Sequence, residues 1–351
     1  MKDGPSSILI VKLSAIGDVV HTIPLLEVLR QNLPYARIDW LVEEEASQII
    51  EGHEALDHIF VSRRKSWQRR FFRGEEMGVV LKEVRRFLKE LRSCRYELVI
   101  DLQGLFKSGI LTGVSKGKRK IGFTGSREGS SIFLTERPYV FDYDRHALDR
   151  YLTVAEYLNC ANNSWRGAIP VWDCHQIRMD KIIGEELLQG ERLIAINPMA
   201  RWKTKLWKQD RFALLADRLQ RELSCQIIFT GSREDRLTLD RIVGMMEGHA
   251  INLAGRTSLK ELAYLYSKCG LMISTDTGPM HIAAAMGCPV VALFGPTAPW
   301  RTGPYGDRHK VVMEEVDCSP CFKKRCNHLS CMNKITVEKV FETVRAFFLE
   351  S

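Results

Sequence analysis

The segment from residue 8 to residue 24 reads ILIVKLSAIGDVVHTIP, a short apolar strand followed by a small-residue loop and the start of a helix. A strand that turns into a helix through such a loop is typical of α/β sheets that hold a nucleotide phosphate. This loop carries Asp18, whose negative charge does not suit a phosphate. The segment therefore predicts an α/β fold and points to another role for Asp18.

The alternation of strand and helix continues along nearly the whole chain. Strands are expected at residues 8–12, 38–42, 58–61, 98–102 and 120–123 of the first half, and at 193–197, 226–231, 271–275 and 290–295 of the second, with helices between them, as at 18–32 and 79–91. Continuous apolar strands separated by helices predict parallel sheets covered on both faces. The polar, turn-rich segment 160–174 is expected to link two α/β halves of similar size.

The composition of the 351 residues, 45% hydrophobic and 27% charged, is that of an ordinary globular protein. The sequence contains neither a run of about 18 apolar residues nor the features of a signal peptide, so we expect a cytoplasmic protein. Its net charge of +8 suits an anionic partner. Aromatic side chains stand among the arginines of residues 63–73, which favours contact with an anionic lipid surface over a merely solvated face.

The segment 273–306, ISTDTGPMHIAAAMGCPVVALFGPTAPWRTGPYG, contains the strongest indication of a ligand site. A strand ends at its third residue and a helix of small residues follows at once, so the first-turn N–H groups are available to a phosphate. Thr277 would add a hydroxyl donor, and His281 would lie one turn into the helix. Asp276 would accept hydrogen bonds from sugar hydroxyls. A merely capped helix with a buried histidine would explain fewer of these polar groups.

Further polar side chains follow two other strands of the second half: Arg201, Lys203 and Lys205 after one, and Glu234 and Asp235 after the next. Lysine and arginine at such a position suit a diphosphate, and the two acids suit the hydroxyls of a ribose. The Gly-, Pro- and Thr-rich segment 295–306 is expected to form a second loop at the same place. Together these segments predict a sugar-nucleotide pocket.

Three motifs resemble those of glycosyltransferase family 9, the ADP-heptose:lipopolysaccharide heptosyltransferases. They are KLSAIGDVVHTIP at 12–24, DLQGLFKSG at 101–109, and DTGPMHIAAA with VVALFGPT at 276–297. They occur in both halves of the chain and in the family's order. Two further segments, IDWLVEE at 38–44 and SRRKSW at 62–67, look more like heptosyltransferase I, which adds the first heptose to Kdo-lipid A, than heptosyltransferase II.

The resemblance implies a GT-B fold, in which two Rossmann-like domains face a central cleft. An acceptor-binding domain is expected at 1–165 and a nucleotide-sugar-binding domain at 176–335. A C-terminal helix at 336–351 is expected to cross back to the first domain. The reaction implied is an inverting, metal-independent transfer of heptose from ADP-heptose to the Kdo of Kdo-lipid A, with no cofactor.

By motif, the resemblance gives Asp18 the role of general base. The donor-binding positions that it implies are Ala200, Arg201, Lys205, Glu234, Asp235, Thr257, Asp276, Thr277, Gly278 and His281. The ribose-binding acid falls at Asp235 by spacing, and the adjacent Glu234 could also serve. The family's phosphate loop can carry two threonines where this chain has Ala200 and Arg201, so charge would replace hydroxyl contacts there. Candidates for binding the carboxylates and phosphates of the acceptor are Arg63, Arg64, Lys65 and Lys107.

The expected partners are therefore ADP-heptose, Kdo-lipid A and the anionic cytoplasmic face of the inner membrane, contacted peripherally by a monomer, and not nucleic acid. A heptosyltransferase II-type enzyme and a family 9 transferase with another nucleotide sugar are the alternatives. A nucleotide-linked oxidoreductase would share the sheets, but the first loop lacks its G-x-G-x-x-G pattern. A non-catalytic lipid- or nucleic-acid-binding protein would leave Asp18 and Asp276 unexplained.

The segment CSPCFKKRCNHLSC groups Cys318, Cys321, Cys326 and Cys331. The Cys-x-x-Cys pair is a good half-site for a structural zinc. The spacing of the other two cysteines does not follow the usual zinc patterns. Reduced thiols that stabilise a loop and a structural zinc site are both open interpretations.

Overall fold

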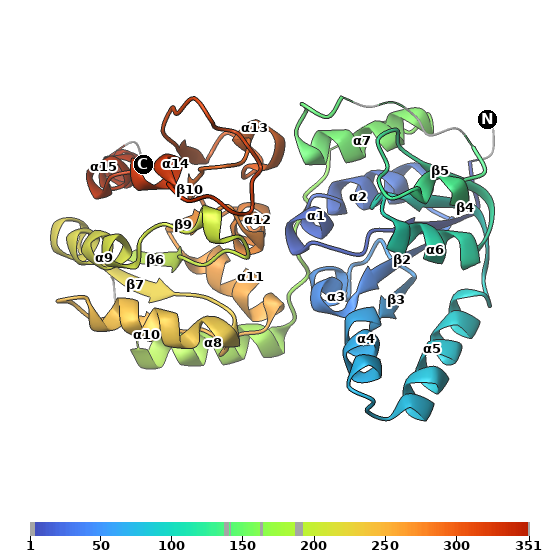
Figure 1. Cartoon of the computed structure of the whole chain (residues 1–351), viewed down its shortest axis with the longest axis horizontal. Helices are drawn as coiled ribbons and strands as arrows, with labels where there is room; N and C mark the ends of the chain where they lie inside the picture. The colour runs from blue at the N-terminus through green and yellow to red at the C-terminus, as the bar shows by residue number, and fades with distance from the viewer. Residues whose placement is uncertain (1–3, 137–139, 141, 162–163, 187–191, 350–351) are drawn as a thin grey trace. The chain divides into compact units, whose positions relative to one another are not determined.

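The computed structural model describes residues 4–136, 140, 142–161, 164–186 and 192–349. The chain divides into two compact units, residues 1–170 and 171–351 (Figure 1). The division falls inside the polar segment 160–174, where the sequence predicts a link between two α/β halves. Each unit is built around one parallel sheet.

The sheet of the first unit has the strand order β3-β2-β1-β4-β5, and all its neighbours are parallel. Its strands are β1 (Ser7–Val11), β2 (Arg37–Glu43), β3 (His58–Ser62), β4 (Arg95–Asp101) and β5 (Lys116–Gly122). The helices are α1 (Ile16–Val20), α2 (Ile23–Asn32), α3 (Glu44–Ile50), α4 (Arg64–Phe72), α5 (Met77–Leu91), α6 (Phe106–Val114) and α7 (Ala147–Tyr157). Central β1 is apolar and buried from its second residue onward, as a strand covered on both faces must be.

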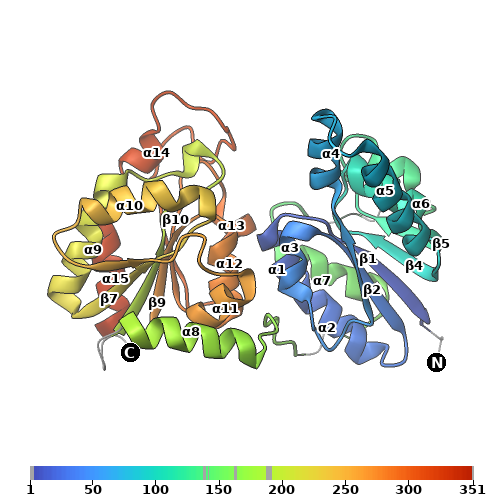
Figure 2. The same cartoon turned by 90° about the horizontal axis from the view of Figure 1, so that it is seen from below.

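The second sheet has the order β11-β10-β9-β6-β7-β8, again all parallel. Its strands are β6 (Arg192–Asn197), β7 (Cys225–Phe229), β8 (Ala250–Asn252), β9 (Leu271–Thr275), β10 (Val290–Leu293) and β11 (Lys310–Val312). The helices are α8 (Asp173–Glu186), α9 (Gln209–Leu223), α10 (Arg236–Gly244), α11 (Leu259–Lys268), α12 (Gly278–Ala285), α13 (Pro299–Thr302), α14 (Ser330–Asn333) and α15 (Val337–Leu349). Helices α9, α10 and α15 lie on one face, and α8, α11 and α12 on the other (Figure 2). Counted within its unit, this is the Rossmann order 3-2-1-4-5-6.

Two details differ from the sequence-based prediction. Strands β8 and β11 were not predicted, because each has only three residues and too short an apolar run to stand out. The single helix expected at 18–32 is two helices, α1 and α2. Pro24 lies in the first turn of α2 and lacks an N–H, so it cannot extend the hydrogen bonding of α1. Asp18 therefore lies on a short helix of its own at the end of β1.

The C-terminal helix α15 packs on its own unit. Its buried residues Val340, Phe341 and Val344 belong to the apolar core of the second unit, and the helix contacts α9, β10 and β11. The guanidinium of Arg218 on α9 lies 3.9 Å from the centre of the Phe341 ring and pairs with Glu338. The apolar face of α15 is therefore used within the second unit.

Candidate active site

The carboxylate of Asp18 is held at the carboxyl end of β1. Its Oδ2 accepts a hydrogen bond from the Ala15 N–H at 3.1 Å, and its Oδ1 accepts one from the Tyr151 hydroxyl at 3.1 Å. The side chain is still 38% exposed. A carboxylate that is oriented by two donors and reachable by a ligand has the geometry required of a general base.

Lys12, the residue directly after β1, lies behind this carboxylate. Its buried ammonium donates to the Tyr151 hydroxyl at 2.7 Å and to the Leu102 carbonyl at 3.0 Å, and lies 3.8 Å from Asp18 Oδ1. Burial lowers the pKa of Lys12, and the charges of Asp18 and Asp101 act against that shift. The contacts form a chain from Lys12 through Tyr151 to Asp18, which restricts the orientation of the carboxylate.

Sequence reasoning missed both Lys12 and Tyr151 as site residues. A lysine at the end of an otherwise apolar buried strand was a signal for the first. Tyr151 is 133 residues from Asp18 and belongs to α7, so no local pattern identifies it. Only the packing of α7 brings the hydroxyl to the loop.

The DLQGLFKSG motif holds the first loop in place from the neighbouring strand β4. Buried Asp101 accepts hydrogen bonds from the N–H groups of Gln103 and Gly104 and from the Ser108 hydroxyl. The amide oxygen of Gln103 accepts the N–H groups of residues 13 and 14 at 3.1 and 3.0 Å. Burial raises the pKa of Asp101, although these hydrogen bonds oppose the shift. The motif thus fixes the backbone that carries Asp18.

The four cations expected to bind the acceptor lie around three consecutive glutamates at the end of β2. The ion pairs are Arg63 with Glu44 at 3.0 Å, Arg64 with Glu43 at 2.8 Å, Lys107 with Glu43 at 3.2 Å, and Lys65 with both Glu43 and Glu45. A cavity of about 390 Å³ opens here, lined by Glu43, Glu44, Glu45, Ser62, Arg63, Lys65, Ser66 and Arg69. The structure therefore brings the four cations together, already paired with carboxylates.

Glu43 is the centre of this cluster and was not predicted as a site residue. Its carboxylate is almost fully buried. Burial by itself raises the pKa of Glu43, but hydrogen bonds and charge from Arg64 and Lys107 outweigh it, so the pKa is lowered. The ionised carboxylate anchors both cations, and Lys107 also donates to the Ser14 hydroxyl at 3.0 Å. Glu43 thus links Arg64, Lys65 and Lys107 to the Asp18 loop.

Replacement of Glu43 by glutamine should lower the free energy of unfolding at neutral pH, because two cations lose their buried partner. Since the folded-state pKa of Glu43 is depressed, its stabilising effect is present above the unfolded value of 4.5 and is lost as the pH falls below it. Urea unfolding should therefore show a difference from the wild type at pH 7 that narrows below pH 4.5. Exposed Glu45, replaced in the same way, serves as the control. A difference that widens at acid pH would contradict the assignment.

In the second unit, Asp276 joins three strand ends. It follows β9 and is buried, and its Oδ2 lies 2.5 Å from the Lys205 ammonium and accepts the Thr297 hydroxyl at 2.6 Å. The Thr275 hydroxyl donates to the Met199 carbonyl at 2.9 Å. These contacts connect the loops after β6, β9 and β10. The loop expected at 295–306 therefore does reach the predicted ligand site.

Helix α12 begins at Gly278, directly after Asp276 and Thr277. Thr277 precedes the helix with an extended backbone, and its side chain makes no capping hydrogen bond. The Thr277 hydroxyl therefore leaves the N–H groups of the first turn available to a ligand. His281 is buried on the same helix. An anion is favoured at such a helix terminus, and Lys205 lies beside the same strand end.

The remaining donor-side residues lie at the same edge of the second sheet. The Gly255 N–H donates to the Gly231 carbonyl at 3.0 Å, which connects the loop before Thr257 to the loop before Glu234. Asp235 accepts hydrogen bonds from the N–H and the hydroxyl of Ser232, so it closes its own turn. Glu234 is exposed, which makes it the better candidate for a ribose. At the phosphate loop, Ala200 is partly buried and Arg201 exposed.

The cysteine segment supports two of these loops. The N–H groups of Cys321 and Phe322 donate to the Pro296 carbonyl at 3.0 and 2.7 Å, and the Ser319 hydroxyl donates to the Gly295 carbonyl at 2.5 Å. The Thr204 hydroxyl donates to the carbonyl of residue 323 at 2.9 Å. The segment thus braces both the loop of Lys205 and the loop of Thr297.

Cys318, Cys321, Cys326 and Cys331 are free thiols, of which Cys331 is buried and Cys318 exposed. Within the described ranges no group of three or more His, Cys, Asp or Glu side chains is arranged to hold a metal ion. Reduced thiols in a bracing loop and a structural zinc site both stay predictions.

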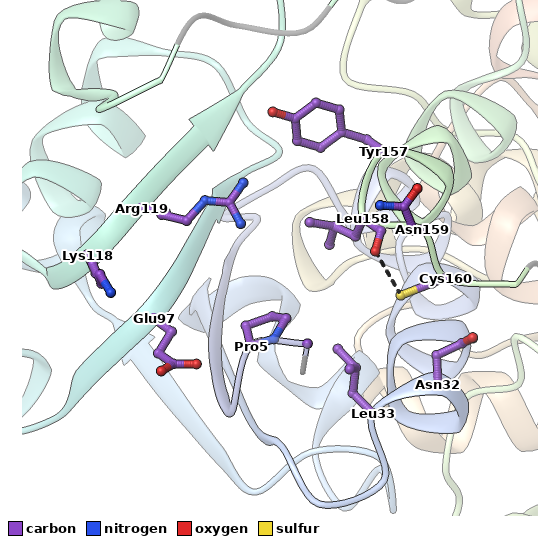
Figure 3. A pocket seen from close by; sticks show the side chains of 11 residues that line it. Pro5, Asn32, Leu33, Glu97, Lys118, Arg119, Tyr157, Leu158, Asn159 and Cys160 are labelled. Carbon is purple, nitrogen blue, oxygen red and sulfur yellow. Dashed lines mark hydrogen bonds between the residues drawn. The ribbon is translucent and has the colours of Figure 1, made fainter. Parts of the chain in front are cut away.

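Another cavity, of about 670 Å³, lies in the first unit away from Asp18 (Figure 3). Its lining includes Pro5, Glu97, Arg119 and Tyr157, which lie before β1, on β4, on β5 and at the end of α7. Pro5 precedes β1, whereas Asp18 follows it, so this cavity is at the opposite end of that strand. Ligands of parallel sheets bind at the carboxyl ends, and we assign this cavity no function.

Comparison with known proteins agrees with this geometry. The profile of glycosyltransferase family 9 (heptosyltransferase) matches residues 84–331. Lipopolysaccharide heptosyltransferase 1 of Pseudomonas aeruginosa is 29% identical over 340 residues, covering 92% of this chain and 87% of that protein. The crystal structure of a family 9 glycosyl transferase from Veillonella parvula superposes with a TM-score of 0.84 at 26% identity, covering 100% and 99% of the two chains.

The Escherichia coli heptosyltransferase WaaC with ADP superposes with a TM-score of 0.76 at 24% identity, covering 97% and 99% of the two chains, and so agrees in fold. Two Rossmann-like sheets in one chain are the architecture of the GT-B fold, as predicted. The profile match spans more than half of the sequence, in both units. The chain belongs to glycosyltransferase family 9, the heptosyltransferases, and is a glycosyltransferase.

Proposed function

We propose that this glycosyltransferase acts in lipopolysaccharide biosynthesis and transfers heptose from ADP-heptose to the Kdo of Kdo-lipid A. The observation that carries the proposal is the carboxylate of Asp18, oriented by Ala15 and Tyr151 at a strand end of a family 9 chain. The name of the Pseudomonas relative, a lipopolysaccharide heptosyltransferase, supports the lipopolysaccharide acceptor, and the ADP in the Escherichia coli structure supports the donor.

In the proposed reaction Asp18 takes the proton of an acceptor hydroxyl while that oxygen attacks the anomeric carbon of the heptose. The attack comes from the face opposite ADP, the bond from this carbon to the diphosphate oxygen breaks, and ADP leaves with the bonding electrons, so the configuration inverts. The second unit would bind the donor, with Glu234 at the ribose and Thr257 near the adenine. Lys205 and the amino end of α12 would stabilise the negative charge of the leaving diphosphate.

Lys12 and Tyr151 are proposed as positioning residues for Asp18. Replacement of Tyr151 by phenylalanine removes the hydroxyl between the Lys12 ammonium and Asp18 Oδ1. Loss of a hydrogen bond to a charged group costs about 1.5–3 kcal/mol, so kcat should fall about ten- to a hundredfold while the donor KM stays near the wild-type value. Steady-state kinetics check this.

The matched control is Tyr157→Phe, because Tyr157 belongs to the same helix and its hydroxyl bonds to Glu136 at 3.3 Å. If Tyr151 had only a structural role, Tyr151→Phe would lower the melting temperature, and it would not lower kcat at an unchanged donor KM. Equal losses of kcat in the two variants would refute the positioning role.

Turnover is expected to persist in EDTA. The ammonium of Lys205 and the first turn of α12 would supply the positive potential that a divalent metal supplies in other nucleotide-sugar enzymes. The measurement is the initial rate with and without EDTA in otherwise identical buffer. A loss of rate that added Mg²⁺ restores would show that the transfer depends on a metal.

The test of the proposed function is a donor and acceptor screen with purified protein. Transfer from ADP-heptose to Kdo-lipid A should exceed transfer from ADP-glucose and from UDP- and GDP-sugars. Transfer only to an acceptor that already carries heptose would instead identify a heptosyltransferase II-type enzyme. Transfer only from another nucleotide sugar would overturn the donor assignment.

We propose further that the protein acts as a monomer at the cytoplasmic face of the inner membrane, in peripheral contact with it. The acceptor's lipid part supports this location. In the described part of the chain, no helix has the length and apolar character needed to cross a bilayer. Light scattering of the purified protein tests the monomer, and a mass of two or more chains would contradict it.

A further inference from the structure

Helices α4 and α5 form a hairpin that projects from the first unit (Figure 1). Phe87 and Leu91 anchor the base of the hairpin in the apolar core, and the Trp67 ring lies 5.4 Å from that of Phe87. Further out, Glu83 on α5 accepts hydrogen bonds from the Trp67 indole at 2.8 Å and from the Arg70 guanidinium at 3.0 Å. The two helices are therefore firmly joined, and their connection at 73–76 is held out from the sheet.

The tip of this hairpin is apolar and exposed. Every residue from 71 to 79 is exposed, and the large apolar side chains of the tip are Phe71 (49%), Phe72 (84%), Met77 (47%), Val79 (47%) and Leu81 (47%). Scattered single apolar residues are normal at a protein surface, but five large exposed ones within residues 71–81, two of them phenylalanines in ring contact, are typical of a surface that binds a partner.

The charge around the tip is strongly positive. Residues 63–92 contain eleven Lys and Arg against four Glu, a net charge of +7 within a chain of +8. Glu83 and Glu76 pair with Arg70, and Lys82, Arg85 and Arg86 on α5 are exposed. Lys and Arg side chains near an anionic membrane surface are attracted to its headgroups and strengthen binding. A second copy of the chain would bring two such basic hairpins together, which their repulsion disfavours.

We propose that the α4–α5 hairpin docks this protein on an anionic lipid bilayer. The Phe71, Phe72 and Met77 side chains enter the boundary between headgroups and acyl chains, and the basic side chains behind them contact the headgroups. Aromatic and aliphatic residues next to Lys and Arg are the composition of elements that lie at a membrane interface. Docking itself does not depend on the sugar that is transferred.

The hairpin also starts where the acceptor-side cavity lies. Arg63 and Lys65 line that cavity, and α4 continues from them toward the tip. This connection rests on the proposed function: a lipid-linked acceptor would meet the cations at the base of the hairpin while the tip is in the bilayer. The bilayer is thus a second binding partner, and it is bound by residues of the hairpin tip that do not bind the acceptor.

The test is co-sedimentation of the full-length protein with vesicles that contain no lipopolysaccharide. One set contains phosphatidylglycerol and phosphatidylethanolamine, and the other only phosphatidylcholine. The wild type should bind the anionic vesicles, less so in high salt, and bind the neutral ones at least about tenfold more weakly. The variant Phe71→Ser/Phe72→Ser should lose at least about tenfold in affinity, since its two serines lack the apolar surface that the phenylalanines would bury in the bilayer.

The matched control is Ile177→Ser/Leu237→Ser, which removes two side chains of similar exposure, 69% and 71%, from the second unit. Wild-type binding by the Phe71/Phe72 variant, equal loss in the control, or no binding to anionic vesicles would each overturn the proposal. A dimer of the wild type that the Phe71/Phe72 variant lacks would identify a second copy as the occupant instead. Binding without substrate is separate from transfer, so failure of the donor screen leaves this result unaffected.

Discussion

Replacement of Asp18 by asparagine is expected to lower kcat by on the order of 10²-fold or more, the usual scale for loss of a general base. The amide oxygen of asparagine can accept the Ala15 N–H in place of Oδ2, and the amide NH2 then faces the Tyr151 hydroxyl, to which it can donate, so the loop should keep its structure. The amide has no basic oxygen to take the acceptor's proton, so the loss should be in turnover. Initial rates at saturating donor and acceptor measure it.

Binding of ADP separates this effect from misfolding. The proposed donor residues all belong to the second unit and Asp18 to the first, so calorimetry should give an ADP affinity near that of the wild type. Asp144→Asn, an exposed aspartate of the first unit, is the matched control and should keep wild-type turnover. Wild-type kcat in Asp18→Asn would end the general-base assignment.

Replacement of Lys205 by methionine is expected to lower kcat by on the order of 10²–10³-fold, because the diphosphate loses its main positive charge as it leaves. Methionine keeps the length and apolar stem of lysine and removes only the ammonium. ADP should also bind more weakly, which calorimetry will show. Lys208→Met, an exposed lysine three residues further along the chain, is the control and should change neither quantity much.

The Lys205 variant also affects stability, and the experiment must separate this effect from the loss of turnover. Lys205 lies 2.5 Å from buried Asp276, so its loss leaves a carboxylate without its cation and costs up to about 3 kcal/mol of stability. The double variant Lys205→Met/Asp276→Asn should recover most of this stability but not the turnover. Recovery of turnover in the double variant would show that Lys205 acts only by neutralising Asp276.

Most of the fold was predictable because its signals are local. The apolar runs at 8–12, 98–102 and 271–275 correspond to β1, β4 and β9 within a few residues. A buried parallel strand must be apolar throughout, so each such strand is visible without its neighbours. The three-residue strands β8 and β11 lie at the edges of the second sheet and bury less, which is why their sequences did not identify them.

The ends of helices and the surfaces on which they pack were less predictable from the sequence. The break between α1 and α2 depends on one proline, and its effect on the helix was underestimated. The position of α15 depends on the apolar groove between α9 and the second sheet, and its own sequence shows only an amphipathic helix. An amphipathic pattern shows that a face is buried but not what buries it.

The sequence by itself determined the two Rossmann-like units, the polar residues at their strand ends and the membership of family 9. These depend on residue types at positions directly after apolar strands, and a parallel sheet brings all such positions to one edge. The tertiary structure alone decided how those residues are held. Tyr151 reaches Asp18 across 133 residues, and Glu43 reaches Lys107 across 64. Such contacts follow from which strands are neighbours and how a distant helix packs, and no local pattern encodes either.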